Sequence, residues 1–436
     1  MAEDRAPPIF RAHLTDPLKA RIIQKVVVYW IQYNIFGVQR GFTGSKETDM
    51  KVRTTALAAT AFAAAASGFL LLSLGAAQAA ETQTVKLGLA APMTGAQAQY
   101  GKDFESGVQL AIDDFNATKP TIDGKETKFV LEALDDQADP KTGTVVAQKL
   151  VDDGIKGMLG HFNSGVTIPA SAIYSHAGIP QISTATAPAY TRQGFKTTFR
   201  MMTSDTQQGG VMGKYVVETL HAKRIAIIDD RTAYGQGLAE QFEMAVKAAG
   251  GNIVDHQFTS DKAVDFKAIL TGIKSKNPDF IYYAGADAQS APMVKQARTL
   301  AMKATFASGE MSKTEDFIKI AGPAADGAIV SLAGLPLDKM PGGAGFTQRY
   351  KAKFGSEPTT YAPYTYDGAI AMMQAMQKAN SSDPSVYLPV LAKTDMKGVT
   401  SDHFAYDKYG DLRDAIITVY KCENGQWKPI TVLGSK

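Results

Sequence analysis

The stretch GMLGHFNSGVTIPASAIY, residues 157–174, decides the fold class because its character changes twice within a few residues. A short apolar run, 157–160, is followed by a cluster of small polar residues and then by apolar residues at helical spacing. This pattern predicts a buried strand, a polar turn and a helix. The unpaired N–H groups and partial positive charge at the start of such a helix suit an anionic ligand.

The same alternation continues on both sides of this stretch. TVKLGLAAP (84–92) and KFVLEALDD (128–136) are typical of strands, whereas residues 101–117 and 139–154 have helical periodicity. Repeated β-α-β units predict parallel sheets with helices on both faces. A second set has the same order: helix 206–221, strand 224–230, helix 235–249, strand 252–258, helix 264–275, strand 279–285, helix 287–300 and strand 304–309.

The segments beyond residue 327 predict that the chain returns to the first set. AIVSLAGLP (328–336) indicates a crossing strand, helices are expected at 343–354 and 361–379, and the tail 403–429 alternates like a hairpin. Repeated crossings between two α/β units form a hinge, and two hinged lobes enclose a cleft. We expect lobe 1 to comprise 84–201 plus about 334–397, and lobe 2 to comprise 202–333 plus about 398–436.

Residues 50–79 have the features of a cleaved secretory signal peptide. Lys51 and Arg53 form a basic start, an apolar run follows, and Ala77-Gln78-Ala79 matches the small-x-small cleavage pattern. A membrane anchor is the alternative interpretation, but the run is rich in Ala and interrupted by Thr, Ser and Gly. We expect residues 1–49 to be an upstream extension outside the fold, and the exported chain to be periplasmic.

The charge and cysteine content exclude several partners. Residues 1–79 carry nine of the 46 Lys and Arg and five of the 43 Asp and Glu, which leaves 37 against 38 and a net charge near −1. Without a basic block, the exported part has no expected nucleic-acid partner. The single cysteine, Cys422, permits neither an intramolecular disulfide nor a thiolate metal cluster.

No set of catalytic or metal-binding residues assembles in the sequence. The six histidines are scattered, and neither a G-x-S-x-G motif nor a nucleotide-binding glycine loop is present. The acid pairs 135–136 and 229–230 follow strands, where such residues more often cap helices than bind Mg²⁺. We therefore expect no enzyme activity, no metal and no cofactor.

Polar and aromatic residues do gather at the expected carboxyl ends of strands, where ligands bind in open α/β sheets. The first unit offers hydroxyl groups and helix N-termini, and the second offers acids. Such opposed surfaces suit a zwitterion, with its carboxylate on the first lobe and its ammonium on the second. The residues are Tyr100, Ser164, Ala185 and Thr186 in the first unit, and Tyr234, Asp287 and Glu310 in the second.

At these positions the sequence resembles the leucine/isoleucine/valine-type periplasmic binding proteins of ABC transporters. The resemblance runs from about Val85 to the C-terminus and includes "PMTGAQAQYGKDFESGVQLAIDDFNA", "DDQADPKTGTVVAQKLVDDGIKGMLGH", "RIAIIDDRTAYGQGLAE" and "FASGEMS". It implies the type I periplasmic binding protein fold, in which two Rossmann-like α/β lobes with parallel sheets are joined by a hinge of three crossovers and close on a ligand.

The resemblance also implies a role for each candidate residue. The ligand carboxylate would contact Ser164, the Ala185 backbone and Thr186. The ammonium would contact Glu310, near the Ala185 carbonyl and Tyr234, and Tyr100 and Phe162 would line the side-chain pocket. The sequence departs from the family pattern in two respects. The family's paired cysteines are absent from the segment 135–140 and from the position of Asn163, and Asp287 stands where a tyrosine is expected.

These features predict a monomeric periplasmic receptor that binds an amino acid, branched-chain or related, and delivers it to an ABC permease. A sensory or regulatory receptor of the same fold, for an amide or another amino acid, is the alternative. A hydrolase of amides is a further alternative from another class, disfavoured by the missing catalytic set.

Overall fold

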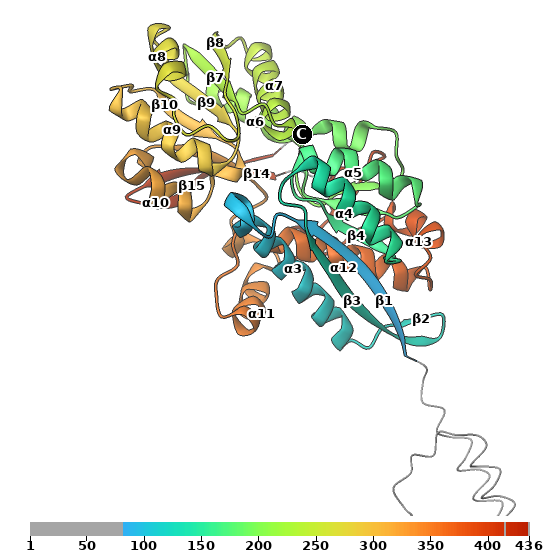
Figure 1. Ribbon diagram of the computed structural model, residues 1–436. Coiled ribbons are helices and arrows are strands. Elements are labelled where there is room, and N and C mark those ends of the chain that lie inside the picture. Colours follow the sequence, from blue (N-terminus) through green and yellow to red (C-terminus); the bar gives the residue numbers. More distant parts are fainter. Residues whose placement is uncertain (1–81, 414–415, 435–436) are drawn as a thin grey trace, which may run out of the picture. The chain divides into compact units, whose positions relative to one another are not determined.

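The computed structural model describes residues 82–413 and 416–434. The predicted signal peptide (50–79) and upstream extension (1–49) lie outside these residues. The described chain forms two α/β lobes, each built on its own sheet (Figure 1). Within the described part of the chain, no helix combines the length and the apolar character needed to cross a membrane.

The first lobe contains a sheet of six strands in the order β2-β3-β1-β4-β5-β6. All neighbours pair in parallel except β2, which is antiparallel to β3 at the edge. The parallel order confirms the β-α-β interpretation of the sequence. The strands are β1 (Gln83–Ala91), β2 (Thr121–Ile122), β3 (Lys125–Asp135), β4 (Gly157–Gly160), β5 (Gln181–Ser183) and β6 (Thr198–Arg200).

Helices cover both faces of the first sheet because its central strands are apolar on both sides. Leu89 and Leu159 pack in one core cluster with residues of α3 and α12, and Ala90 and Met158 pack in another with residues of α4 and α5. Figure 1 shows α3 and α12 apart from α4 and α5. The helices of this lobe are α3 (Ala98–Ala117), α4 (Pro140–Asp152), α5 (Ser164–His176), α11 (Gly343–Phe354), α12 (Ala362–Lys378) and α13 (Pro384–Leu391).

The second lobe contains a sheet of seven strands in the order β15-β14-β11-β10-β9-β7-β8. Strands β7 to β11 are parallel, and β14 and β15 add an antiparallel edge. A short antiparallel pair outside this sheet, β12 (Asp395–Met396) and β13 (Phe404–Ala405), comes before the last passage between the lobes, and the segment around it bonds to the first lobe, where Arg200 N donates to the carbonyl of Gly410. The strands of the larger sheet are β7 (Ile225–Asp229), β8 (Ile253–Phe258), β9 (Phe280–Ala284), β10 (Thr305–Ser308), β11 (Ile329–Ala333), β14 (Ile416–Glu423) and β15 (Gln426–Gly434).

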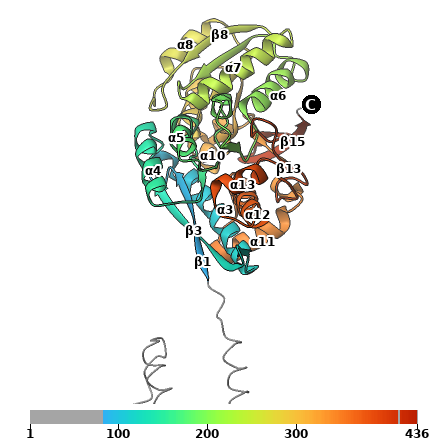
Figure 2. The same ribbon diagram turned by 90° about the vertical axis from the view of Figure 1, so that its right-hand side faces the viewer.

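The second sheet is also covered on both faces. Tyr282 on β9 stacks on Phe242 of α7 with ring centroids 3.8 Å apart, while its neighbour Tyr283 packs in a different core cluster with residues of α8 and α9. Figure 2 shows α6 and α7 side by side in this lobe. The helices are α6 (Asp205–Glu218), α7 (Ala233–Ala248), α8 (Lys267–Ser275), α9 (Asp287–Thr299) and α10 (Glu315–Ala321).

The chain passes between the two lobes three times: after β6, after β11 and before β14. Two α/β lobes joined by three crossovers are the predicted type I periplasmic binding protein fold. The predicted hairpin at the C-terminal end is also confirmed, because Asn424 and Gly425 have φ values of 55° and 71° and form the tight turn between β14 and β15. Cys422 on β14 is a buried free thiol.

Candidate functional site

The turn between β4 and α5 is fixed by buried hydrogen bonds. His161 Nδ1 lies 2.8 Å from Asp136 Oδ2, and His161 Nε2 lies 3.1 Å from the hydroxyl of Tyr174. The carbonyl of His161 accepts hydrogen bonds from Ser183 Oγ at 2.5 Å and Thr167 Oγ1 at 3.1 Å. All five side chains are buried, so the turn presents the residues that follow His161 in one orientation.

A small cavity lies where strands of both sheets end. Ligands of open α/β sheets bind beyond the carboxyl ends of the strands, and this cavity has that position. Its lining comes from the segments that follow β4, β5, β7 and β10, together with the residue before α12. The lining residues are Phe162, Asn163, Ser164, Thr184, Thr186, Tyr234, Glu310, Met311 and Tyr361.

The wall from the first lobe is made of hydroxyl groups. Thr184 and Thr186 are each only 3% exposed, and their hydroxyl oxygens have no hydrogen-bond partner among the described residues. Ser164 Oγ accepts a hydrogen bond from Ala187 N at 3.2 Å. A buried hydroxyl without a partner costs about 1–3 kcal/mol, so these groups indicate a surface that is completed by a polar ligand.

The wall from the second lobe carries a negative group. Glu310 is 3% exposed, and its Oε2 accepts hydrogen bonds from Gln208 Nε2 and, at 2.9 Å, from the hydroxyl of Tyr234. Burial raises the pKa of Glu310, and these two donors offset part of that rise because they stabilise the carboxylate. A buried carboxylate of this kind is a suitable partner for an ammonium group.

Three aromatic rings form the apolar side of the site. The ring of Tyr100 stacks on Phe162 with centroids 5.3 Å apart, and Tyr361 meets both rings edge-on at 5.8 and 4.8 Å. All three residues are at most 5% exposed. Such a cluster can shield the apolar side chain of a small ligand from water.

Asp287 connects the two lobes next to this aromatic cluster. Its Oδ1 accepts a hydrogen bond from the Tyr100 hydroxyl at 2.6 Å, and its Oδ2 accepts from Gln99 Nε2 at 3.0 Å and Thr314 Oγ1 at 2.6 Å. The Tyr100 hydroxyl also lies 2.8 Å from the carbonyl of Met311. The carboxylate is therefore satisfied by protein donors from both lobes.

The structure brings together five of the eight residues predicted for the site: Phe162, Ser164, Thr186, Tyr234 and Glu310 all line the cavity. Of the other three, Tyr100 and Asp287 are not lining residues and bond to each other. The N–H of Ala185 donates to Ser183 Oγ at 2.9 Å, so this group is engaged within the protein. The role of each residue in binding a ligand stays a prediction.

Sequence reasoning missed three cavity residues, Thr184, Met311 and Tyr361, and the Glu310 partner Gln208. Thr184 lies next to two predicted residues, so its position after a strand was a usable signal. Gln208 and Tyr361 belong to segments that follow the passages of the chain between the lobes after β6 and after β11. No local sequence pattern distinguishes them from ordinary residues at helix ends. Asn163, singled out as a departure from the family, does line the cavity.

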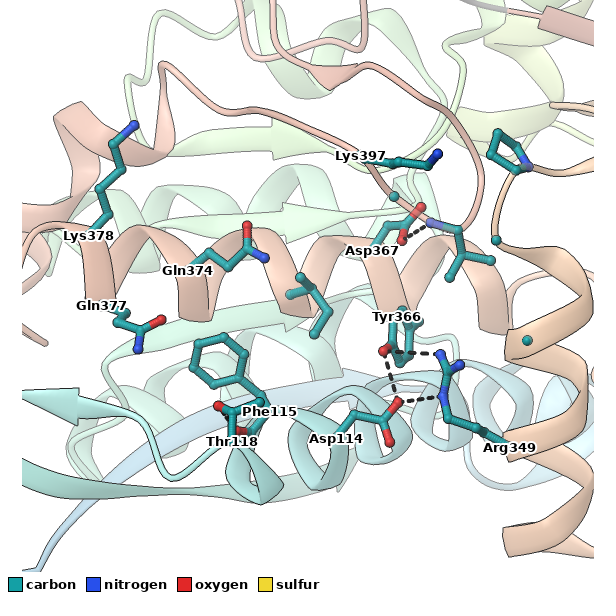
Figure 3. Close-up of a pocket in the computed structure, with 16 residues that line it drawn as sticks. Asp114, Phe115, Thr118, Arg349, Tyr366, Asp367, Gln374, Gln377, Lys378 and Lys397 are labelled. Carbon is teal, nitrogen blue, oxygen red and sulfur yellow. Dashed lines mark hydrogen bonds and ion pairs between the residues drawn. The ribbon is translucent and has the colours of Figure 1, made fainter.

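A wider groove lies on the first lobe, between α3, α11, α12 and the segment 397–399 (Figure 3). The carboxylates that line it have protein donors: Asp114 Oδ2 accepts from Arg349 Nε and from the Tyr366 hydroxyl, both at 2.8 Å. Asp367 accepts from the backbone N–H groups of Val399 at 2.7 Å and Thr400 at 2.8 Å. Because these two carboxylates already have donors, neither requires a ligand.

The described residues contain no group of three or more His, Cys, Asp or Glu side chains placed to hold a metal ion. Both ring nitrogens of the buried His161 are occupied by protein groups, one by Asp136 and the other by the Tyr174 hydroxyl. These bonds hold the turn after β4 in place. The cavity itself presents a carboxylate, Glu310, and the hydroxyl groups of Thr184 and Thr186.

Comparison with known proteins agrees with the two-lobe fold and the position of the cavity. The periplasmic binding protein family matches residues 84–426. The chain belongs to this family. Among its curated relatives, the "Leu/Ile/Val-binding protein homolog 1" of Brucella suis is 35% identical over 343 residues, which cover 78% of this chain and 91% of the relative. The "Leucine-, isoleucine-, valine-, threonine-, and alanine-binding protein" of Pseudomonas aeruginosa is 30% identical over 373 residues, 85% of this chain and 97% of that protein.

Solved structures of periplasmic binding proteins are similar over the same region. The branched-chain amino acid binding protein LivJ of Streptococcus pneumoniae, solved in complex with isoleucine, superposes with a TM-score of 0.72 at 27% identity, covering 81% of this chain and 100% of that one. These likenesses confirm that the chain is a periplasmic binding protein of the leucine/isoleucine/valine type with the type I fold.

Proposed function

We propose that this protein is a periplasmic receptor that binds an amino acid, branched-chain or related, between its two lobes and delivers it to an ABC permease. The observation that carries the proposal is the polarity of the cavity. Unpartnered hydroxyls of Thr184 and Thr186 face it from one lobe, and the carboxylate of Glu310 faces it from the other. A zwitterion satisfies both walls at once.

The predicted roles of the individual residues fit this geometry. Ser164, at the first turn of α5, and Thr186 would bind the ligand carboxylate, helped by the partial positive charge of the helix N-terminus. Glu310 and Tyr234 would bind the ammonium. Phe162 and Tyr100 would shield an aliphatic side chain. Relatives named for leucine, isoleucine and valine support this ligand class.

Calorimetric titration of the purified chain with L-leucine, L-isoleucine, L-valine, L-threonine and L-alanine tests the proposal. We expect at least one of them to bind, and its deaminated carboxylic acid analogue to bind far more weakly because Glu310 then lacks a cation. Tight binding of the deaminated acid, or no binding of any amino acid, would contradict the proposal. Unchanged ligand recovered after prolonged incubation would agree with binding without turnover.

The transport role needs a separate experiment in cells. We propose that residues 50–79 direct export and are removed, and that the monomeric mature chain docks on a permease. Deletion of the gene should abolish uptake of the radiolabelled amino acid that the protein binds, and expression of the chain from Met50 should restore it. Normal uptake in the deletion strain, with altered gene regulation, would favour the sensory receptor.

A further inference from the structure

A second carboxyl group lies beside the acidic wall of the cavity. Asp205 is the first residue of α6, and its N–H donates to the carbonyl of Thr186 at 2.8 Å. The start of α6 is therefore anchored to a residue that lines the cavity. The Asp205 side chain is completely buried, its carboxylate oxygens make no well-formed hydrogen bond among the described residues, and the hydroxyl of Thr186 interacts with the carboxyl and lowers its pKa.

The first turn of α6 also supports Glu310. Gln208, one turn after Asp205, donates a hydrogen bond to Glu310 Oε2, while its own Oε1 has no partner within the described part of the chain. Two carboxyl groups and an unpartnered amide oxygen are thus collected around one position. Buried acceptors that lack donors are costly, so this arrangement is completed by a ligand rich in N–H groups.

The surroundings permit only one of these carboxyl groups to be charged easily. Burial raises the pKa of Asp205 well above its ordinary value, and the charge of Glu310 raises it further. The hydroxyl of Thr186 and then Arg200 oppose this rise only partly, and the guanidinium Nε of Arg200 already donates to Asp411 Oδ1 at 3.0 Å. The other titratable groups that face the pair are the neutral hydroxyls of Tyr234, Tyr282 and Tyr361.

We propose that Asp205 and Glu310 act as one acidic pair that retains a proton while the site is empty and releases it to solvent when the ammonium of a ligand enters. Asp205 is then a positioning residue that sets the preference of the site for a cationic group, and Glu310 is the residue that contacts the ligand ammonium. The inference rests on the proposed function, since it requires an amino acid as ligand. A ligand without an ammonium leaves the proton in place.

Calorimetry in pairs of buffers with different ionisation enthalpies measures this proton directly. Titration with L-leucine and L-isoleucine at pH 5, 6, 7 and 8 should show proton release on binding, and an association constant that rises by up to about tenfold per pH unit where the release approaches one proton. The variant Asp205→Asn keeps the shape of the side chain but removes the second acid. Its proton release should be lost and its affinity should vary little with pH.

Asp230→Asn is the matched control. Burial raises the pKa of Asp230 to about 6, and its Oδ1 accepts from Thr232 N and Oγ1 at 2.9 and 2.6 Å, bonds that asparagine retains. Asp230 does not line the cavity, so its variant should release the proton as the wild type does. Thermal unfolding of each variant verifies that it is folded before titration.

The possible outcomes separate this inference from the proposed function. Equal heats in both buffers at every pH for the wild type would overturn the inference, whether or not Asp205→Asn folds, and would leave amino-acid binding intact. Proton release that persists in Asp205→Asn would assign the proton to another group and would also overturn it. Failure of every amino acid to bind would overturn the proposed function and the inference with it.

Discussion

The wide groove of the first lobe and the small cavity between the lobes differ in how their polar groups are satisfied. In the groove, Arg349, Asp114 and Tyr366 bond to one another, as Figure 3 shows. In the cavity, the hydroxyls of Thr184 and Thr186 have no partner among the described residues. The difference indicates that unmet hydrogen-bonding demand, and not size, marks the ligand site. Variants in both places can test this comparison.

The largest effect is expected for Glu310→Ala in the cavity. Without Glu310 the ammonium loses the carboxylate that contacts it, and we expect binding to weaken by about 2–5 kcal/mol. Calorimetry of the wild type and the variant with the same amino acid measures the loss. A decrease in affinity of less than about threefold would show that the acidic wall does not contact the ligand.

In the groove, a buried carboxyl should influence folding stability and leave binding unchanged. Burial raises the pKa of Asp367 to about 6 from an ordinary value of 3.8. The folded state therefore holds this proton at a pH where the unfolded chain has lost it, and the contribution of Asp367 to stability falls as pH rises from about 4 to above 6. The fall is on the order of 3 kcal/mol.

Urea unfolding of the wild type and of Asp367→Asn at pH 4, 5, 6 and 7 measures this contribution. The stability of the wild type relative to the variant should decrease as pH increases, and ligand affinity should be equal at each pH where both proteins are folded. Parallel stability curves would show that this carboxyl does not titrate in the range.

Thr186→Val should affect binding and stability in opposite directions. Valine has nearly the same shape but lacks the hydroxyl, so a charge-assisted hydrogen bond to the ligand carboxylate is lost, at a cost of about 1.5–3 kcal/mol in binding. The ligand-free variant should be at least as stable as the wild type, because an unpartnered buried hydroxyl is removed. Reduced stability with unchanged affinity would assign Thr186 a structural role.

Asp287→Ala should have a smaller effect, because this residue contacts the opposite lobe and is not a lining residue. The hydroxyl of Tyr100 would keep its bond to the Met311 carbonyl and lose the one to Asp287. We expect affinity to decrease by about 1 kcal/mol and the ligand-bound protein to scatter X-rays as a more open particle. A loss as large as that of Glu310→Ala would indicate direct contact with the ligand.

The smallest effect is expected for Arg349→Ala in the groove. Its ion pair with Asp114 is partly exposed, and such pairs contribute about 0–1 kcal/mol to stability. Ligand affinity should remain within error of the wild type. A marked loss of binding would mean that the groove is coupled to the cavity, and the comparison between the two regions would fail.

Much of the fold was predictable because its elements are long and strongly periodic. The predicted helices 101–117 and 361–379 correspond to α3 and α12, and Asp139 caps α4 through Thr142 N at 2.7 Å as expected. The short elements β6, α10 and α13 were not predicted. Segments of three to eight residues carry too little periodicity to be recognised.

The site was predictable where function follows local position and not where it depends on distant segments. Ser164, Thr186 and Glu310 follow strands, so the topology alone placed them at the cavity. Asp205 and Gln208 resemble helix-capping residues in the sequence, and only the docking of α6 beside Glu310 gives them another meaning. The pairing of Asp287 with Tyr100 likewise depends on how the two lobes meet.

The three passages between the lobes have a consequence for biosynthesis. The first lobe acquires α11, α12 and α13 only after the second has begun, and the larger sheet gains β14 and β15 from the last residues of the chain. Neither lobe can complete its folding while the chain is still being synthesised. Contacts between such remote segments slow folding, which keeps a nascent chain unfolded for longer and so compatible with threading through a translocation channel.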